Sequence, residues 1–561
     1  MAAGIDPASL RRATEAVEGA EPIGQVGFGD MTRSLLQTVM RSRGTLRRGA
    51  SLGREGLKIA AGRSEIEPAK GDWRFKDPAW RDNPAYRRVM QAYLAWAASM
   101  EELVDTAALE WRDSERARFF MGILTSAAAP TNTLPGNPAA LKRAFETGGL
   151  SLVRGARSVV RDARSNGGMP AQVNTSAFTI GEDLAATPGA VVYRDDVCEV
   201  IQYTPSTPTT RARPVLIVPP QINKYYFLDL APGRSLVEYV VSRGLPVFMI
   251  SWRNPGPQQG EWDLDTYAAA VLRAVDVTTE VSRSDDVNVL GFCAGGILTA
   301  TVLSHLAATG DDRVRSASFG VTLLDFAIPN TVGLFDSSPL IHMGRARSSR
   351  AGVLDGRSLA NVFTWLRPND LVWNYWVNNN LMGNEPPTFD ILAWNSDATN
   401  LPARLHGQLL SIFTDNLVAT PGGIDVLGTP VDLSRVQLDT YVTGALTDHL
   451  TPWKGCYRTT QLLPGDSTFV LSNAGHIASL VNPPGNPKAH FFAGPEPGSD
   501  PDAWRAGAER RSGTWWEHWS DWVCERSGDE RKAPAKLGSR RHKVIEPAPG
   551  SYVRGAEPIA A

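Results

Sequence analysis

The stretch that decides the fold is NVLGFCAGGILT, residues 288–299. A short apolar run ends at Gly291, and a run of small residues typical of a helix begins just after Cys293. The pattern predicts a strand, a tight turn and a helix with the cysteine at the apex, which is the G-x-S-x-G nucleophile elbow with sulfur in place of oxygen. Cys293 is therefore a candidate nucleophile. A buried structural cysteine is the alternative interpretation of this residue taken alone.

The neighbours of Cys293 fit such an elbow. Gly291 and Gly295 have a steric role, because side chains at these positions would collide with the adjoining strand and helix. The helix behind Cys293 would point its first N–H groups at the sulfur and so favour the thiolate.

Length and composition restrict the classes of protein that need to be considered. The chain has 561 residues, more than one ordinary core, so we expect two domains or one large domain with insertions. The formal net charge of −2 gives no general attraction to nucleic acid or to a membrane surface. The four cysteines have neither the spacing of metal ligands nor the density of a disulfide framework. No signal sequence or membrane-spanning run is present, so we expect a cytoplasmic protein with no metal, no nucleic-acid partner and no integral membrane segment.

Periodicity divides the chain into two regions. Residues 1–195 predict a mainly helical N-terminal domain, with a helix over 86–109. Residues 196–561 alternate apolar strands, such as 215–218 and 246–251, with helical stretches such as 263–281. This alternation is typical of a parallel sheet covered by helices, and the fold class is therefore α/β with an α/β-hydrolase catalytic domain.

The alternation is interrupted between about residues 326 and 435. This segment is rich in asparagine, proline and tryptophan, including Trp365, Trp373, Trp376 and Trp394. We expect it to be a cap insertion over the active site, since a long insertion between core strands often has that role. Strands resume at 439–444 and at 467–471.

Each resumed strand is followed by a polar residue that a hydrolase triad needs. Asp448 follows the first strand and His476 follows the second. The order nucleophile, acid, histidine is the order found in α/β-hydrolases, so Cys293, Asp448 and His476 form the predicted catalytic set. Two alternatives stay open: Asp325 also follows a strand and would serve as the acid, and His449 lies next to Asp448 and would serve as the base.

An oxyanion hole needs two backbone N–H groups. One should be that of Ala294, directly after the nucleophile, and the other should come from the loop after the strand that ends at Val218. The next two residues of that loop are prolines, which have no N–H, so residue 221, 222 or 223 must supply it. We favour Ile222.

Several motifs together resemble the polyhydroxyalkanoate synthase family over nearly the whole chain, from about residue 64 to 553. They are VPPQINKYY at 218–226, SWRNP at 251–255, GFCAGG at 291–296, RPNDLVWNY at 367–375, TDH at 447–449 and GHI at 475–477. Four further motifs are similar to those of the class II branch, which prefers medium-length chains. They are NYWVNN at 374–379, NEPP at 384–387, PTNT at 130–133 and NPPGNPK at 482–488. The tail VIEPAPG at 544–550 looks more like class I, short-chain enzymes.

The resemblance implies a function. It places the family's nucleophile on Cys293, its acid on Asp448 and its histidine on His476. It implies polymerisation of (R)-3-hydroxyacyl-CoA with release of CoA through a cysteine-bound acyl thioester, with no cofactor. It also implies a cytoplasmic homodimer on polyhydroxyalkanoate granules, in contact with the growing chain and the granule surface.

Two other classes compete with this expectation. A cysteine-nucleophile thioesterase or esterase would share the three residues and differ in admitting water. A non-catalytic granule-binding protein would use the elbow only for packing. Near the C-terminus, Trp515, Trp519 and Trp522 share one helical face, which we expect to dock onto the core rather than contact polymer.

Overall fold

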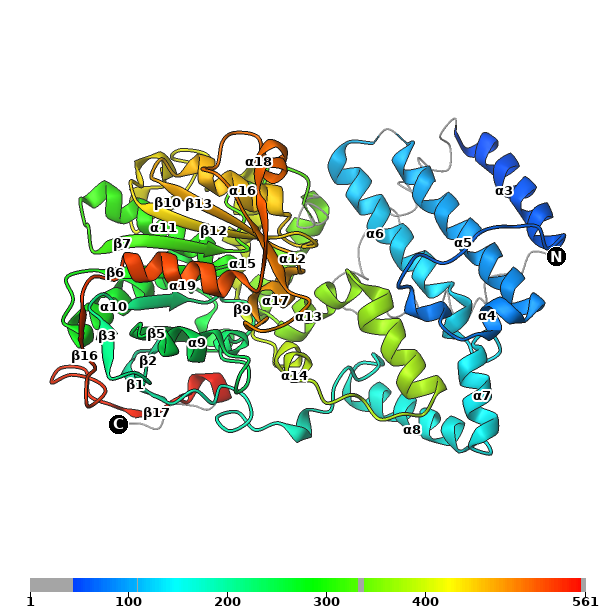
Figure 1. The fold of residues 1–561 in the computed structure, drawn as a ribbon, viewed down its shortest axis with the longest axis horizontal. Coiled ribbons are helices and arrows are strands. Elements are labelled where there is room, and N and C mark those ends of the chain that lie inside the picture. The colour runs from blue at the N-terminus through cyan, green and yellow to red at the C-terminus, as the bar shows by residue number, and fades with distance from the viewer. Residues whose placement is uncertain (1–43, 108, 331–337, 556–561) are drawn as a thin grey trace. The chain divides into compact units, whose positions relative to one another are not determined.

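The computed structural model describes residues 44–107, 109–330 and 338–555, and it forms two compact units (Figure 1). The first contains the described residues up to Thr175, a short segment that ends at Gly344, and Ser358–Leu392. The second contains the remainder, beginning at Ser176. The second unit thus starts before the expected boundary at residue 195, and the segment 326–435 contributes residues to both units.

The first unit is helical, as the sequence predicts. Its helices are α3 (Gly44–Ala60), α4 (Ala79–Asp82), α5 (Pro84–Asp105), α6 (Trp111–Ala127), α7 (Pro138–Glu146) and α8 (Leu150–Ser165). The helix expected over 86–109 is α5, and its start is specified locally. The Asn83 side chain accepts hydrogen bonds from two N–H groups of the first turn, and Pro84 occupies a position where no N–H is needed.

Two tryptophans of the 326–435 segment belong to the core of this first unit. Trp365 clusters with Ile123 of α6, and Trp373 clusters with Ala127 of the same helix. The segment contains α12 (Ser338–Ala351), α13 (Gly356–Trp365), the π-helices η7 (Asn369–Trp373) and η8 (Trp376–Leu381), α14 (Asp390–Ser396) and α15 (Ala403–Asp415). The pairs β8 (Val353–Leu354) with β9 (Leu401–Pro402) and β10 (Asp425–Val426) with β11 (Thr429–Pro430) complete its regular structure.

The second unit is built on an eleven-stranded sheet with the order β15-β14-β13-β12-β7-β6-β4-β5-β2-β1-β17. Its central strands run parallel: β5 (Val247–Trp252), β4 (Val215–Val218), β6 (Val287–Phe292), β7 (Val314–Gly320), β12 (Asp439–Ala445) and β13 (Ser467–Ser472). Antiparallel strands complete both edges: β1 (Gly189–Arg194), β2 (Cys198–Tyr203), β17 (Glu546–Pro547), β14 (His490–Ala493) and β15 (Glu509–Ser512). The α/β fold class is confirmed.

The chain reverses its direction of travel across the sheet at β4. From β4 it passes to β5 on one side, and then to β6, β7, β12 and β13 in turn on the other. In open parallel sheets, ligands bind beyond the carboxyl ends of the strands at such a switch point. The loops after β4 and β6 are therefore the natural place for a site.

Helices cover both faces of this sheet. A side chain added at Gly291 of β6 would meet α11 (Ala294–Thr309), whereas the neighbouring Phe292 packs against Trp515 of α19 (Trp515–Glu525). Successive strand residues point to opposite faces, so α11 and α19 lie on opposite sides. The helix α9 (Leu236–Ser242) joins α19 through a ring contact between Tyr239 and Trp516, and α10 (Leu264–Ser282) packs beside α11.

The tryptophans of α19 are buried, as expected for docking onto the core. Trp515 and Trp519 are 1% and 0% exposed, and Trp522 is 8% exposed. The Trp515 indole donates to the carbonyl of Ser479, and the Trp519 indole donates to the hydroxyl of Ser318. These hydrogen bonds fix the helix against the strand β7, which contains Ser318, and against the short helix that follows β13, which contains Ser479.

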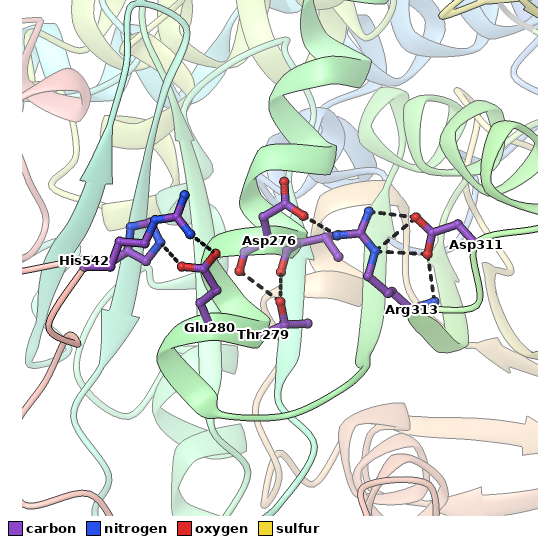
Figure 2. A network of polar contacts seen from close by, with 8 residues as sticks. Asp276, Thr279, Glu280, Asp311, Arg313 and His542 are labelled. Atoms are coloured by element: carbon purple, nitrogen blue, oxygen red, sulfur yellow. Dashed lines mark hydrogen bonds and ion pairs between the residues drawn. The ribbon is translucent and has the colours of Figure 1, made fainter. Parts of the chain in front are cut away.

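The C-terminal segment is tied to α10 by ion pairs (Figure 2). Glu280 accepts from Arg541 at 2.8 Å and lies 2.9 Å from the imidazole of His542. On the same helix, Asp276 pairs with Arg313, which also binds Asp311 at 2.7 Å. Such partly exposed pairs each contribute about 0–1 kcal/mol, so they guide the path of the tail more than they stabilise the fold.

Candidate active site

The predicted elbow is present at the end of β6. Cys293 lies between β6 and α11 with φ 49° and ψ −121°, a left-handed backbone conformation that is strained for a residue with a side chain. Its N–H donates to the carbonyl of Gly320 at 3.0 Å, and its own carbonyl accepts from Gly296 at 2.9 Å. Surrounding hydrogen bonds thus hold the strained turn in place.

The glycines around the cysteine are required by close approach. A Cβ at Gly295 would lie 2.4 Å from the carbonyl oxygen of Val218 and 2.5 Å from that of Pro219. A Cβ at Gly296 would lie 2.1 Å from the hydroxyl of Thr322. The first turn of α11 therefore packs directly against the end of β4, which brings the loop after β4 beside the cysteine.

The structure brings Asp448 and His476 together. Asp448 lies in the loop after β12, and His476 begins α17 (His476–Leu480) after β13. The imidazole Nδ1 lies 2.7 Å from the Asp448 carboxylate Oδ2. Both side chains are buried, with 8% exposure for His476 and 0% for Asp448, so water screens this contact only weakly.

The charges of the pair follow from its surroundings. Burial by itself lowers the pKa of His476, but the Asp448 carboxylate, together with the neighbouring Cys293, outweighs burial and raises that pKa to about 10. Burial raises the pKa of Asp448, and the imidazole with the Thr451 hydrogen bonds outweighs it, so that this pKa is lowered. The pair is therefore an imidazolium and a carboxylate at neutral pH.

Cys293 interacts with the same imidazole. Its side chain is within hydrogen-bonding reach of His476, whose Nδ1 is already occupied by Asp448. The imidazole is therefore placed to exchange a proton with the sulfur. The three side chains that sequence order selected thus form one connected chain of contacts in the second unit.

Thr451 is a member of this network that the sequence analysis missed. Its hydroxyl donates to Asp448 Oδ2 at 2.7 Å and lies 3.1 Å from His476 Nδ1. Its N–H and that of Leu450 donate to Asp448 Oδ1 at 3.0 and 2.8 Å. A usable signal existed, because an aspartate followed by a threonine three residues later is typical of a side-chain-capped turn.

The geometry favours Asp448 over the alternative acid. Asp325 is buried, but its carboxylate accepts from Arg458 at 2.6 Å, from Asn416 at 3.0 Å and from the N–H of Ala327 at 2.9 Å. These partners occupy both of its oxygens. The alternative base, His449, is only half-buried, and it is His476 that contacts Asp448.

The first predicted oxyanion donor, Ala294, directly follows the cysteine, and the second, Ile222, lies in the loop after β4. In the part of the chain that the structure describes, the N–H groups of Ala294 and Ile222 have no protein acceptor. The loop with Ile222 is held from several sides: Asn223 has φ 63°, the Trp394 indole donates to the carbonyl of Lys224 at 2.7 Å, and Lys224 pairs with Asp397 at 2.8 Å. Ile222 stays a prediction as the second donor.

The other three cysteines have different environments. Cys198 and Cys456 are fully buried, and burial raises the pKa of each thiol. The Cys456 sulfur lies 3.5 Å from the carbonyl of Thr451, and Cys524 is half-buried with its pKa also raised by burial. Only Cys293 combines a turn between strand and helix with a histidine partner.

Among the described residues, no group of acidic, histidine or cysteine side chains is arranged to hold a metal ion. In the same residues, no helix combines the length and apolar character needed to cross a membrane.

Comparison with known proteins gives two family matches. Residues 71–240 match the family described as the poly-beta-hydroxybutyrate polymerase N-terminus, and residues 214–483 match the alpha/beta hydrolase fold. The second match covers the strands β4 to β13 and all three residues of the candidate triad, in agreement with the predicted fold.

Among characterised relatives, poly(3-hydroxyalkanoate) polymerases 1 and 2 of Ectopseudomonas oleovorans are each 46% identical to this chain. The first comparison covers 97% of this chain and 98% of the relative, and the second covers 90% of each. The poly(3-hydroxyalkanoate) polymerase subunit PhaC of Cupriavidus necator is 40% identical over 88% of this chain and 85% of its own length.

Proposed function

Since the chain belongs to the poly(3-hydroxyalkanoate) polymerase family, we propose that it polymerises (R)-3-hydroxyacyl-CoA into polyester and releases CoA. The observation that supports this most directly is the contact chain from Cys293 through His476 to Asp448, at the carboxyl ends of parallel strands. CoA enters as part of the thioester substrate, and the proposed reaction needs no cofactor or metal.

The proposed first step transfers the acyl group to sulfur. The Cys293 thiolate attacks the thioester carbonyl, and the tetrahedral oxyanion is held by the N–H groups of Ala294 and Ile222. The bond to the CoA sulfur then breaks, and the CoA thiolate takes the proton carried by His476. Because one thioester replaces another, this step is nearly isoenergetic and the acyl group stays activated. A serine ester would lose that activation.

The proposed second step forms the polyester bond. A 3-hydroxyl group attacks the acyl thioester on Cys293, its proton passes to His476, and the Cys293 thiolate leaves as the ester forms. After this step His476 carries its proton and Cys293 is a thiolate, as at the start of the first step. An alkyl hydroxyl is much less acidic than a thiol, so this step depends more strongly on the base and on the carboxylate that orients it.

Water must be excluded because hydrolysis of the acyl-cysteine would compete with elongation. We propose that the 326–435 segment contributes to this exclusion. Support comes from Trp394, whose indole is bonded to the loop that contains Ile222 and whose ring lies 5.3 Å from that of Phe227.

We further propose a preference for medium-length chains, a homodimeric assembly, and a cytoplasmic location on polyester granules, where the protein meets the growing chain. Support for the chain length is the motif similarity to class II enzymes together with 46% identity to the two Ectopseudomonas oleovorans polymerases, against 40% to the Cupriavidus necator subunit.

The test is an assay that follows CoA release and polymer together. Purified protein is supplied with defined (R)-3-hydroxyacyl-CoA substrates, and CoA, free hydroxy acid and polyester are all measured. The proposal predicts that polyester accounts for the CoA released. Free hydroxy acid in place of polyester would instead support the alternative, a cysteine-nucleophile thioesterase or esterase.

A further inference from the structure

One helix of the first unit has the opposite burial pattern to that of an ordinary amphipathic helix. The buried positions of α8 are Ser151, Gly155, Ser158 and Asp162, which are small or polar. A Cβ at Gly155 would lie 2.0 Å from the carbonyl oxygen of Asn380 in η8, so this small-residue face is held in close contact. The apolar side chains of α8 point to the outside instead.

Exposed apolar side chains are concentrated on this helix and on the end of α7. Twelve large apolar residues are exposed in the part of the chain that the structure describes, and six of them fall between residues 145 and 160. They are Phe145 at 83%, Leu150 at 58%, Leu152 at 37%, Val153 at 50%, Val159 at 39% and Val160 at 49% exposure. An isolated exposed valine needs no explanation, but a continuous apolar stripe marks an interaction surface.

Arginines form a second stripe on the same helix. Arg154, Arg157, Arg161 and Arg164 recur at intervals of three or four residues, which aligns them along one side of the apolar stripe. A surface hollow is lined by both sets, including Val153, Ala156, Arg157, Val160 and Arg164. Among the described residues, Arg161 has acidic partners at 3.6 and 3.9 Å, whereas Arg154, Arg157 and Arg164 form no ion pair.

We infer that the outer face of α8, with Phe145 of α7, docks onto an anionic phospholipid surface. A helix with an apolar face beside a row of basic side chains lies in the plane of a lipid interface, with the apolar groups among the acyl chains and the cations at the phosphates. The protein's net charge of −2 gives no general attraction to such a surface, so the local arginine stripe has to provide it.

The charge pattern of this face favours a phospholipid surface over two other partners, a second copy of the chain and an uncharged polyester surface. A second copy docking through the same patch would bring eight arginines together, since a two-fold interface pairs a surface with itself. An uncharged polyester surface would match the apolar stripe but would not use the arginines. Lipid phosphates are complementary to both stripes at once.

The test measures binding of the full chain to vesicles by co-sedimentation. Phosphatidylcholine vesicles are compared with vesicles of phosphatidylcholine and phosphatidylglycerol in equal parts. The proposal predicts binding to the anionic vesicles that is at least about tenfold tighter than to neutral ones and that weakens with salt, because exposed charges are screened over about 10 Å.

Substitutions identify the surface. Val153→Asp with Val160→Asp should abolish binding, and Arg157→Gln with Arg164→Gln should weaken it about fivefold for each arginine. The matched control is Val89→Asp with Arg87→Gln on α5, where Val89 is 46% exposed, and it should bind as the unsubstituted protein does. All variants should keep their thermal unfolding midpoint and CoA release, because the substituted side chains are exposed.

Three results would overturn the inference: equal binding to neutral and anionic vesicles, unchanged binding by both α8 variants, or equally tight binding to uncharged polyester particles. Concentration-dependent self-association that the aspartate variants disperse, without vesicle binding, would also overturn it in favour of a second copy. Vesicle binding does not require catalysis, so the binding measurements separate this inference from the proposed polymerisation.

Discussion

The Nδ1 atom of His476 lies 2.7 Å from the Oδ2 atom of Asp448 in a buried environment, and the two side chains come from loops after adjacent parallel strands. Parallel neighbours end at the same edge of a sheet, so residues 28 positions apart meet without any special loop path. The contact places a charged pair beside the strained turn of Cys293, and it determines several expected outcomes.

Replacing the nucleophile should abolish CoA release. Cys293→Ala removes the only sulfur that lies on a strand-to-helix turn beside His476, so we expect no acylation. Cys198→Ala, Cys456→Ala and Cys524→Ala should each retain most of the activity. The activity of all four variants is measured as release of the CoA thiol from a hydroxyacyl-CoA. Appreciable turnover by Cys293→Ala would refute the assignment of Cys293 as the nucleophile.

Replacing the carboxylate should impair elongation more than acylation. A thiol beside a helix N-terminus needs less help from a base than an alkyl hydroxyl does, so Asp448→Asn should still acylate Cys293 in one turnover but fail to build long polymer. Rapid mixing with a hydroxyacyl-CoA gives the first CoA released per enzyme and the later steady-state rate. A fall of both by the same factor would show that Asp448 serves the two steps equally.

Thr451 should act as a positioning residue for Asp448. A hydrogen bond to a charged group contributes about 1.5–3 kcal/mol, so Thr451→Val should lower kcat by about tenfold or more while KM changes little. Thr451→Ser keeps the hydroxyl and should restore most of the activity. The discriminating readout is the pH–rate profile, which should shift in the valine variant only. An unchanged profile with reduced thermal stability would indicate a packing role.

The buried pair should make stability depend on pH in two directions. The pKa of His476 is raised from 6.5 to about 10, so its contribution is complete below about pH 6.5 and is lost as the pH rises through 10. The pKa of Asp448 is lowered, so its contribution is present above about pH 3.8 and is lost as the pH falls further.

Denaturant unfolding between pH 4 and 10 tests this expectation. The difference in unfolding free energy between the unsubstituted protein and His476→Gln should be largest near pH 5–6 and decline towards pH 10. Cys293→Ala keeps the pair and is the matched control, with most of the pH dependence preserved. A difference that does not vary with pH would contradict an ionised pair.

Substrate choice should favour medium-length side chains without excluding shorter ones. One methylene in an apolar pocket changes discrimination by only about 1–3 kcal/mol, so neighbouring chain lengths should overlap. Competition between defined hydroxyacyl-CoA substrates gives the ratios of kcat/KM. Turnover confined to the four-carbon substrate would contradict this expectation.

Much of the second unit was predictable because its signals are local. The run 215–218 is the strand β4, and the stretch 288–299 is a strand, a cysteine turn and a helix, as expected. The glycines at positions 291 and 295 indicate a close approach of neighbouring segments around the elbow, because no side chain fits at either position. The burial of Trp515 and Trp519 also followed from their spacing on one helical face.

Other features depended on residues that are distant in sequence. An aspartate after a strand has the same local signature at positions 325 and 448. Distant partners distinguish them, because Arg458 and Asn416, 133 and 91 residues from Asp325, occupy the carboxylate of Asp325. Trp365 and Trp373 gave the composition of a cap, yet they pack in the core of the first unit against α6. Composition predicts that an aromatic ring will be buried, but it does not predict which element will pack against it.

The helix α8 shows the limit most clearly. Its sequence by itself determines an amphipathic helix with apolar, basic and small-residue stripes, because a period of 3.6 residues sorts side chains by face. Which stripe is buried is decided by the tertiary structure, since the approach of the Asn380 backbone admits only Gly155 and its small neighbours. The apolar stripe is left outside for that steric reason.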